Sequence, residues 1–484
     1  MNAQMKEQLQ KKLQPFHQEH LLTFWDVLSE TERQQLVRQI ENIDFEQINE
    51  LYQRRNEPAQ SLALADKAND PPAYQFSTVP NPLPVKSRKK ITAEEAIQAG
   101  TEALRSGKVA AALVAGGQGT RLGFPHPKGM FPIAPVSGKT LFQIHFEKVL
   151  AASKKYGQHI PYCIMTSPAT HTETVDFLNE NKYFGMNPDD VFVFCQGTMP
   201  AVDLKTGKIL LAEKSSLALS PDGHGGMLKA ISSAAEPAPS GGNCSVLEKL
   251  KQRGIAYLFY HQVDSSLVKI CSPEFLGYHI LSGSELTSQV IRKTKPMDKV
   301  GNVVEADGHL SVIEYSDLPE NVAVKTNPDG SLKIWAGSIA VHIFNTEFLE
   351  QQSQKKDSLP FHFAKKKVPF ADLQSGAEVK PEKENAVKFE KFIFDLMPAA
   401  KNSIVVEVDP PNHYAPLKNK DTADCPETVK RDLSKQFISW LRQAGAEVAD
   451  DAVIEISPLF ADSPEVLKEK IAAGTKMSGK KYFG

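Results

Sequence analysis

Short apolar runs alternate with amphipathic stretches along the middle of the chain. Several runs have the length and the Val, Ile and aromatic content of buried strands: 109–115, 162–166, 191–195, 255–262, 334–343 and 404–408. Between several of them, apolar residues recur at helical spacing: 140–156, 171–181 and 271–282. This alternation predicts a parallel or mixed sheet with helices on both faces. Ligands of such sheets bind beyond the carboxyl ends of the strands.

The N-terminal part has a different pattern. Residues 1–55 carry apolar residues at helical spacing, and Ser29, which Glu30 and Glu32 follow, is predicted to start a helix. Residues 56–91 are rich in Pro, Ala, Asp and Asn, which predicts an irregular connection. Thr92 with Glu95 is typical of a capping box at the start of a further helix. We therefore predict a helical and irregular N-terminal extension that ends at residue 105.

The C-terminal part begins with a passage rich in Pro, Asn and Lys, from Pro410 to Pro426. A helix that contains Phe437 follows, and then a short strand over residues 452–456. We therefore predict a small α+β domain over residues 409–484. The sheet domain would then occupy residues 106–408.

Composition narrows the possible partners. The 484 residues suffice for two to four domains, at about 150 residues per domain. Hydrophobic residues make up 41% and charged residues 24%, as in ordinary globular proteins. The net charge of −2 gives no strong attraction to nucleic acid or to an anionic membrane. We therefore expect small-molecule substrates rather than either of these partners.

Targeting signals and cysteines point to the cytoplasm. The segment MNAQMKEQLQKK lacks the apolar core of a secretory signal, and no apolar run is long enough to cross a bilayer. The five cysteines are odd in number, and no pair has C-x-x-C spacing. Neither a disulfide framework nor a zinc site is expected.

The richest chemical signal follows the strand predicted over 109–115. Glycines gather in the turn after it: Gly116, Gly117, Gly119 and Gly123. Glycine allows positive φ and close approach of another group to the backbone, and successive N–H groups in such a turn can bind an anion. Arg121 and Lys128 add cations beside it. The pattern favours a phosphate-binding site on an α/β sheet.

Two phosphate-binding motifs compete for this signal, and neither fits. A P-loop would end at Gly138-Lys139-Thr140, but Ile133 stands where its first glycine belongs. A dinucleotide fingerprint would need its third glycine at Leu122. The plain alternative is a tight turn without a ligand, and the neighbouring Arg121 and Lys128 weigh against it.

Four further segments each allow a chemical and a plain interpretation. Gln196 could read a nucleobase edge or face water in a turn. The second glycine-rich segment, Pro221–Gly226, could bind a ligand or form a hairpin turn. Asp264 ends an apolar run, where it could hold Mg²⁺ against phosphates or cap a helix. Lys418 lies in a polar loop, where solvation at the surface is the default.

In this order, the segments resemble the UDPGP type 1 family of UTP-dependent sugar-1-phosphate uridylyltransferases, and within it the eukaryotic-type UDP-N-acetylglucosamine pyrophosphorylases. The segments that carry the likeness are LVAGGQGTRLGFPHPKGM, SGKTLFQIHFEKVL, IMTS, NKYFG, QGTMPA, SPDGHGG, VDSSLVK, VIEYSDLP, FEKFIFD and PLKN. They extend over residues 108–420. The resemblance implies a doubly wound, mixed-sheet nucleotidyltransferase core, Rossmann-like and GT-A-like, flanked by the two predicted extensions.

The resemblance also implies roles for individual residues. The groups that would hold the UTP phosphates and uridine are Gly116, Gly117, Gly119 and Thr120. Gln196 and Gly223 would read uracil. The catalytic cations would be Arg121, Lys128 and Lys418. Asp264 would ligate Mg²⁺, the expected cofactor. The residues around the sugar would be His224, Glu314, Ser338 and Phe392.

The reaction that the resemblance implies is formation of a UDP-sugar and pyrophosphate from UTP and a sugar 1-phosphate, with N-acetylglucosamine 1-phosphate as the expected sugar. Such a transfer depends on positioning and charge neutralisation rather than on a covalent nucleophile. This agrees with a chain that shows no Ser–His–Asp or Cys–His constellation. We expect a cytoplasmic monomer or weak homo-oligomer.

Two residues depart from the N-acetylglucosamine branch. That branch usually has Asn at the positions of His224 and Ser338. A UDP-glucose or broad-specificity UDP-sugar pyrophosphorylase therefore remains an alternative, because hydrogen-bonding groups discriminate strongly between sugars. A non-catalytic regulator that binds nucleotide sugars is a second alternative. A nicotinamide dinucleotide dehydrogenase is a third, and the misplaced third glycine weighs against it.

Overall fold

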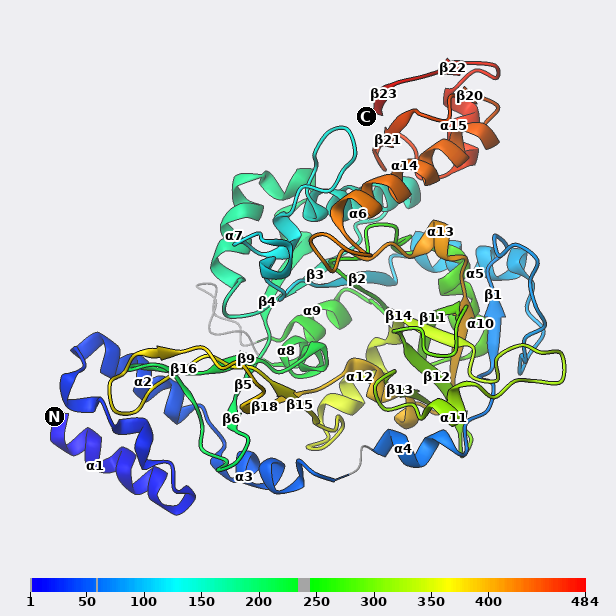
Figure 1. Cartoon of the computed structure of the whole chain (residues 1–484). Coiled ribbons are helices and arrows are strands. Elements are labelled where there is room, and N and C mark those ends of the chain that lie inside the picture. Colours follow the sequence, from blue (N-terminus) through cyan, green and yellow to red (C-terminus); the bar gives the residue numbers. More distant parts are fainter. Residues whose placement is uncertain (1, 58–59, 234–243) are drawn as a thin grey trace. The chain divides into compact units, whose positions relative to one another are not determined.

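The computed structural model describes residues 2–57, 60–233 and 244–484, which fold into two compact units (Figure 1). Unit 1 is drawn from residues 1–59, 196–226 and 359–393. Unit 2 is drawn from residues 60–195, 227–358 and 394–484. These units do not follow the three consecutive segments predicted above, 1–105, 106–408 and 409–484. That division stays a prediction.

A ten-stranded mixed sheet forms the centre of unit 2. Its main path runs through β1 (Ala73–Gln75), β19 (Ser403–Glu407), β11 (Leu286–Arg292), β14 (Ala336–Asn345), β10 (Tyr257–Gln262), β2 (Val109–Val114), β3 (Tyr162–Thr166) and β4 (Val191–Cys195). Along this path only β14 runs antiparallel to its neighbours. A hairpin of β12 (Gly301–Ala306) and β13 (His309–Ile313) joins at β14. The predicted α/β fold with a mixed sheet is confirmed.

Helices pack on this sheet, and the four predicted from the sequence, over 92–105, 140–156, 171–181 and 271–282, are present among others that it did not predict. Those of unit 2 before its C-terminal part are α4 (Gln60–Ala65), α5 (Ala93–Arg105), α6 (Leu141–Tyr156), α7 (His171–Glu180), α8 (Met227–Ser232), α9 (Val246–Gln252), α10 (Pro273–Ser282), α11 (Glu320–Ala323) and α12 (Thr346–Ser353), with short 3₁₀ turns η6 (Lys182–Gly185) and η7 (Pro188–Asp190). Thr92 and Glu95 form the predicted capping box of α5, each bonding the other's backbone N–H. Helix α5 packs so closely on α10 that a Cβ at Gly277 would lie 1.7 Å from the Ala96 carbonyl oxygen. Glycine is required there by the approach of two backbones.

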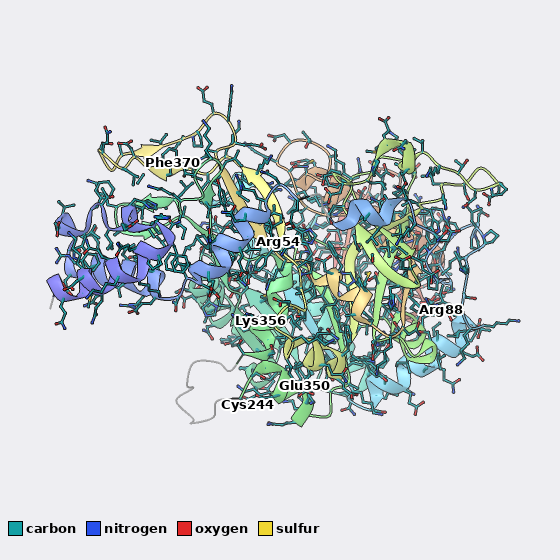
Figure 2. All side chains as sticks on the ribbon, turned by 90° about the horizontal axis from the view of Figure 1, so that it is seen from below. Arg54, Arg88, Cys244, Glu350, Lys356 and Phe370 are labelled. Atoms are coloured by element: carbon teal, nitrogen blue, oxygen red, sulfur yellow. The ribbon has the colours of Figure 1, made fainter. Side chains whose placement is uncertain are left out.

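The segment predicted as an irregular connection is more ordered than expected. It contains α4 and the edge strand β1, which pairs in parallel with β19. Arg88, labelled on the right in Figure 2, donates to the side chains of Asn402 at 2.7 Å and Glu305 at 2.9 Å. A three-residue strand in a Pro-rich segment has no periodicity of its own, and it is the neighbouring β19 that makes it a strand.

The C-terminal part of unit 2 is a small α+β arrangement. Its elements are α13 (Pro410–His413), α14 (Pro426–Gln443), β20 (Glu447–Val448), β21 (Val453–Ile456), α15 (Pro464–Lys470), β22 (Lys476–Met477) and β23 (Lys480–Phe483). Strand β20 pairs with β22 and β21 with β23, both in parallel. Leu441, Ile454 and Leu467 form its own small apolar core.

Unit 1 combines the N-terminal helices with two later excursions of the chain. Its helices are α1 (Asn2–Leu13), η1 (Gln14–Phe16), η2 (Glu19–Leu22), η3 (Trp25–Val27), α2 (Glu30–Glu41) and α3 (Phe45–Arg54). Its strands are β5 (Thr198–Pro200), β6 (Val202–Asp203), β7 (Leu211–Glu213), β8 (Ser216–Leu217), β9 (Leu219–Pro221), β15 (His362–Lys366), β16 (Phe370–Ala371), β17 (Glu378–Val379) and β18 (Ala386–Glu390). One core joins them, with Trp25, Leu36, Ile209 and Phe389 buried in it. Ser29 starts α2, as predicted, and forms a capping box with Glu32.

No helix within residues 2–57, 60–233 and 244–484 has the length and apolar character needed to cross a membrane.

Candidate active site

The predicted phosphate-side residues gather at the carboxyl edge of the unit 2 sheet. Strand β2 pairs in parallel with β3 and with β10, so the three strands end at the same edge. The first glycine turn (residues 116–123) leaves the end of β2, and Asp264 follows the end of β10. Ser167, just after β3, donates from its hydroxyl to the Gly116 carbonyl oxygen at 2.7 Å. This is the edge where α/β sheets bind ligands.

The first glycine turn is braced by bonds to its own carbonyl groups. The Gly119 carbonyl oxygen accepts from the N–H groups of Leu122 and Phe124, and the Gly117 carbonyl oxygen accepts from that of Lys128. The N–H groups of Gly117 and Thr120 donate to no acceptor among the described residues. A turn with rigid backbone and open N–H groups is suited to hold an anion.

Arg121 adds a permanent charge to this turn. It lies in the 3₁₀ turn η4 (Thr120–Leu122), and its side chain is exposed. Within the part of the chain that the structure describes, its guanidinium has neither an ion-pair partner nor a hydrogen-bond partner. An exposed arginine without a protein partner, beside open N–H groups, is placed to meet an anionic ligand.

Lys128 lies at the start of η5 (Lys128–Met130) and faces Asp264. Its Nζ is 3.5 Å from Oδ2 of Asp264 and donates to the Leu417 carbonyl oxygen at 3.1 Å. Both charged side chains are largely buried, with 17% and 18% of their surface exposed. Asp264 lies in a turn and starts no helix, so the helix-cap interpretation of this residue does not hold.

Lys418 is held beside the same aspartate by the chain around it. The Leu417 N–H donates to the Asp264 carbonyl oxygen at 3.0 Å, and Lys418 Nζ donates to the Tyr414 hydroxyl at 3.2 Å. Burial alone would lower the pKa of Lys418, but Tyr414, Asp264 and Asp424 outweigh it and raise that pKa. Lys418 therefore stays charged at neutral pH.

Asp264 offers the ligand chemistry that Mg²⁺ requires, a carboxylate at the edge of an open turn. The described residues contain no cluster of three or more His, Cys, Asp or Glu side chains that could hold a metal alone. Mg²⁺ commonly binds through one or two carboxylates together with substrate phosphates and water. The donor set around Asp264 fits that mode, in which the nucleotide supplies most of the ligands.

Glu314 and Ser338, predicted for the sugar side, come together in unit 2. Ser338 lies near the start of β14 and pairs in register with Gly301 of β12. A Cβ at Gly301 would lie 3.4 Å from Oε1 of Glu314 and 3.9 Å from the Ser338 Cβ. Because β14 is antiparallel to β10, its start lies at the sheet edge where β10 ends and Asp264 follows.

The predicted uracil-side residues come together in unit 1. Gln196 is 5% exposed, and its Nε2 lies 3.4 Å from Oδ1 of Asp222 and 3.5 Å from the Gly223 carbonyl oxygen. The Lys391 N–H donates to the Asp222 carbonyl oxygen at 2.8 Å, and the Gly225 N–H donates to the Lys391 carbonyl oxygen at 2.8 Å. The second glycine turn (residues 221–226) is therefore paired with the segment after β18 and is not an isolated hairpin turn.

His224 and Phe392 form an aromatic pair in the same unit. Their rings are stacked with centroids 5.2 Å apart, and the ring centroids of His362 and Phe392 lie 4.4 Å apart. His224 Nδ1 accepts from the Ile393 N–H at 3.2 Å, so Nε2 carries the ring proton. Burial, with a smaller contribution from His362, lowers the pKa of His224 to about 4. His224 is therefore a neutral hydrogen-bonding group at physiological pH.

The structure thus brings the predicted residues into two sets. Unit 2 holds the phosphate set together with Glu314 and Ser338, and unit 1 holds the uracil set together with His224 and Phe392. Motifs alone did not single out Tyr414, which contacts Lys418, or Asp222, which contacts Gln196. Asp222 lies inside a quoted motif and could have been weighed there. Tyr414 gives no signal in the sequence, because its contact depends on the turn of α13.

Comparisons with known proteins identify relatives of this chain. Residues 62–434 match the sequence model of the family described as UTP–glucose-1-phosphate uridylyltransferase. UDP-N-acetylhexosamine pyrophosphorylase-like protein 1 of Xenopus tropicalis is 35% identical over 489 residues, covering 95% of this chain and 93% of that protein. UDP-N-acetylglucosamine pyrophosphorylase of Saccharomyces cerevisiae is 34% identical over 469 residues, covering 93% and 94%. The crystal structure of uridine diphosphate N-acetylglucosamine pyrophosphorylase from Trypanosoma brucei has a TM-score of 0.79 at 26% identity, covering 96% of this chain and 94% of that one.

The match to the family extends over most of the chain and includes every segment that carries a predicted site residue. The relatives align over nearly their whole length, so the likeness is not confined to one domain. The resemblance predicted from the motifs is confirmed: this chain belongs to the UTP–glucose-1-phosphate uridylyltransferase family.

Proposed function

We propose that this protein transfers the uridylyl group of UTP to a sugar 1-phosphate and releases pyrophosphate, with N-acetylglucosamine 1-phosphate as the preferred sugar substrate. A phosphate oxygen of the sugar 1-phosphate attacks the α-phosphorus of UTP. The bond from that phosphorus to the bridging oxygen breaks, and pyrophosphate leaves with the electron pair. The attacking phosphate is already anionic near neutral pH, so no strong general base is needed.

The convergence of Lys128, Asp264 and Lys418 is the observation that carries this proposal. Three distant segments place two ammonium groups around one carboxylate at the end of β10. A transfer between phosphates needs cations fixed where negative charge develops, and fixed groups need no reorganisation during the reaction. Lys128 would contact the α-phosphate, and Lys418 would reach the phosphates from the opposite segment.

The first glycine turn would hold the rest of the triphosphate. The open N–H groups of Gly117 and Thr120, with Gly116 and Gly119 beside them, would cradle phosphate oxygens and approach the uridine. Arg121 would meet the β- and γ-phosphates and favour their departure as pyrophosphate.

Asp264 would hold Mg²⁺ in this proposal. When bound, the ion would neutralise charge on the phosphates and orient them. The contribution of the chain itself is to fix the Asp264 carboxylate, through the backbone bond from Leu417 and the ion pair with Lys128.

Nucleobase recognition would fall to unit 1. The Gln196 side chain offers a donor and an acceptor, which is the pairing that uracil requires. Its orientation is fixed by Asp222 and by the Gly223 carbonyl group. Gly223 would present its backbone to the same base.

The sugar would be read by His224, Phe392, Glu314 and Ser338. The relatives named for UDP-N-acetylhexosamine and UDP-N-acetylglucosamine favour an N-acetylated sugar. Neutral His224 can donate a hydrogen bond from Nε2, as the amide of the usual Asn would. The cytoplasmic location and the monomeric or weakly associated state stay predictions from the sequence.

The test is pyrophosphate release from UTP and Mg²⁺ with four sugar 1-phosphates: those of N-acetylglucosamine, N-acetylgalactosamine, glucose and galactose. Release with N-acetylglucosamine 1-phosphate above all others is expected. Preferred use of glucose or galactose 1-phosphate would replace the sugar assignment with a UDP-glucose or broad-specificity enzyme. Binding of UDP-sugar by calorimetry without any release would favour the non-catalytic regulator.

A further inference from the structure

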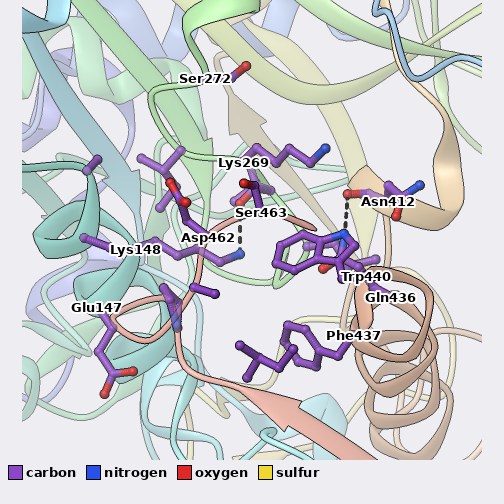
Figure 3. Close-up of a pocket in the computed structure, with 18 of the residues that line it drawn as sticks. Glu147, Lys148, Lys269, Ser272, Asn412, Gln436, Phe437, Trp440, Asp462 and Ser463 are labelled. Atoms are coloured by element: carbon purple, nitrogen blue, oxygen red, sulfur yellow. Dashed lines mark hydrogen bonds between the residues drawn. The ribbon is translucent and has the colours of Figure 1, made fainter. Parts of the chain in front are cut away.

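Unit 2 contains a second pocket, between α6 and the C-terminal helix α14 (Figure 3). Its volume of about 410 Å³ lies within the range of small-molecule sites. In Figure 3, Lys148 lies to the left of the rings of Trp440 and Phe437, and Lys269 lies above them. None of these residues belongs to the predicted substrate site.

Most carboxylates of this pocket already have partners within the protein. Glu147 accepts twice from Lys139, and it points away from the lysine pair in Figure 3. Glu274 accepts from Ser77, and Glu455 accepts from the backbone at Val136 and Ser137. Asp462 pairs with Lys155 at 2.7 Å. Four of the five carboxylates in the wall are therefore bound to other groups, and the fifth, that of Glu465, faces Lys269.

The two lysines lack such partners. Lys148 donates only to the carbonyl oxygens of Ser266 and Val268. The ammonium group of Lys269 has no hydrogen bond or ion pair with any residue in the described part of the chain, and the carboxylates that face it, those of Asp409, Glu274 and Glu465, lie beyond ion-pair distance. Burial, together with the charge of Lys269, lowers the pKa of Lys148 to about 7. A bound anion would offset the cost of keeping both ammonium groups charged.

We propose that this pocket binds a small organic anion, in which a phosphate or carboxylate group is attached to a flat apolar ring. The anionic group would lie between Lys148 and Lys269, and the ring would pack against Trp440 and Phe437. These rings are already arranged edge to face, with centroids 5.8 Å apart, which leaves an aromatic wall for a planar ligand.

The pocket is connected by backbone to the proposed catalytic residues. Lys148 bonds the segment that follows Asp264, at Ser266 and Val268. From the opposite wall, Gln436 of α14 donates to the Asn412 carbonyl oxygen at 2.9 Å, six residues before Lys418. A ligand that binds Lys148 and packs on α14 would shift both the segment after Asp264 and the segment before Lys418. We therefore expect its binding to change the reaction rate, an expectation that rests on the proposed function.

The binding test uses the full-length protein and phenyl phosphate, benzoate and inorganic phosphate, measured by calorimetry and by tryptophan fluorescence. We expect phenyl phosphate or benzoate to bind at one site, and the tighter of the two identifies the anionic group. Lys269→Met should weaken binding by at least about tenfold, because a hydrogen bond to a charged group is lost. The fluorescence change should disappear in Trp440→Phe.

Two further variants test whether the organic anion binds in this pocket. Lys154→Met removes an exposed lysine from the same helix α6 and should leave the affinity unchanged. Lys128→Ala removes a phosphate contact of the substrate site and should also leave it unchanged. Lys148→Met could disturb the segment that Lys148 bonds, so Lys269→Met, which breaks no bond within the protein, is the decisive variant.

The proposal is overturned if neither organic anion binds at millimolar concentration, or if Lys269→Met binds as tightly as the unchanged protein. Inorganic phosphate binding as tightly as both ring compounds would overturn the role of the aromatic wall. Loss of binding in Lys128→Ala would show that the organic anion binds in the substrate site instead.

Turnover gives the second readout. The bound anion should change the kcat or the KM for UTP by about fivefold or more, as allosteric coupling typically does. The change should be absent in Lys269→Met and present in Lys154→Met. Binding without a change in turnover would overturn the coupling. Binding to a protein that shows no uridylyl transfer would contradict the proposed function and leave the pocket assignment supported.

Discussion

The two glycine turns use glycine for opposite physical reasons. In the first, a Cβ at Gly117 would meet no atom within 4 Å, and its N–H donates to no described acceptor. In the second, a Cβ at Gly223 would lie 2.4 Å from the Lys391 carbonyl oxygen, and a Cβ at Gly226 would lie 2.0 Å from Oδ1 of Asp222. The first turn leaves the space beside Gly117 open, although Phe124 fills the space beside Gly119. The second fills the corresponding space with its own chain.

This difference shows what a glycine motif can and cannot say. Both turns follow a strand, and both read in the sequence as ligand loops. The first has open N–H groups and an unpaired arginine, so it is built to receive an anion. The second is packed against the segment after β18, so its glycines serve mainly to position Gln196 and His224. Substitutions at the two turns should therefore fail in different ways.

The largest expected effect is on chemistry beside the first turn. Lys128→Ala removes one of the two ammonium groups at Asp264 and should lower kcat by about 10²- to 10³-fold, as loss of a charge-stabilising donor does. The melting temperature should change little, and Lys154→Ala serves as the matched surface control. A fall of less than about fivefold in steady-state kinetics would remove Lys128 from the catalytic set.

The next largest effect is a difference in stability between alanine variants of the two turns. Gly223→Ala should lower the free energy of unfolding by at least about 1–2 kcal/mol, because φ is +84° there and the new Cβ meets backbone atoms. Gly117→Ala should stay within about 0.5 kcal/mol of the unchanged protein. Urea unfolding of both variants measures the difference.

Kinetic measurements on Gly117→Ala and Gly223→Ala complete the comparison of the two turns. Gly117→Ala puts a methyl group into the open space beside the turn, so its KM for UTP should rise while its fold is intact. Equal losses of stability in the two variants would show that the turns do not differ in the way described. An unchanged KM for UTP in Gly117→Ala would show that this space is not used by the nucleotide.

Much of the central sheet could be predicted because its strands are short apolar runs, and strands such as β2 and β3 are buried on both faces. The apolar runs of β3 and β4 match the strands residue for residue. Strand β11 was missed, because its sequence LTSQVIR carries polar residues in a buried position. Ser288 is fully buried there and satisfied by a hydrogen bond to His342 at 2.6 Å. That pairing exists only once β14 lies beside it, so the local sequence cannot show it.

The candidate site was also predictable only in part. The family resemblance was enough to select Lys128, Asp264 and Lys418, and the structure brings the three side chains together. The resemblance could not show that Glu314 and Ser338 belong to one compact unit and His224 and Phe392 to the other. That division depends on which segments pack into a common core, and no spacing in the sequence records it.

A smaller effect concerns sugar choice. His224→Asn and Ser338→Asn, made singly and together, restore the residues usual in the N-acetylglucosamine branch. Each should change the ratio of kcat/KM for N-acetylglucosamine 1-phosphate over glucose 1-phosphate by about tenfold, the size expected when one polar partner is altered. Pyrophosphate release with both sugars measures the ratio. An unchanged ratio in the double variant would exclude these residues from sugar recognition.

The smallest effect is a pH dependence that belongs to the second turn. Burial lowers the pKa of His224 to about 4 in the folded protein, against an ordinary value of 6.5. Between these values the unfolded chain binds the proton and the folded one does not, so the free energy of unfolding falls as the pH drops from 6.5 toward 4. His224→Asn cannot take up this proton, so proton uptake on unfolding near pH 5.5 should decrease by up to about one. Urea unfolding between pH 7 and pH 5 measures how the free energy of unfolding changes with pH.

Other buried histidines, such as His145 and His279, also have lowered pKa values, so part of this pH dependence remains in the variant. The same slope in the variant and the unchanged protein would show that the ring of His224 is as accessible to protons as in the unfolded chain. The second turn would then be open like the first, and the difference between the two would be lost.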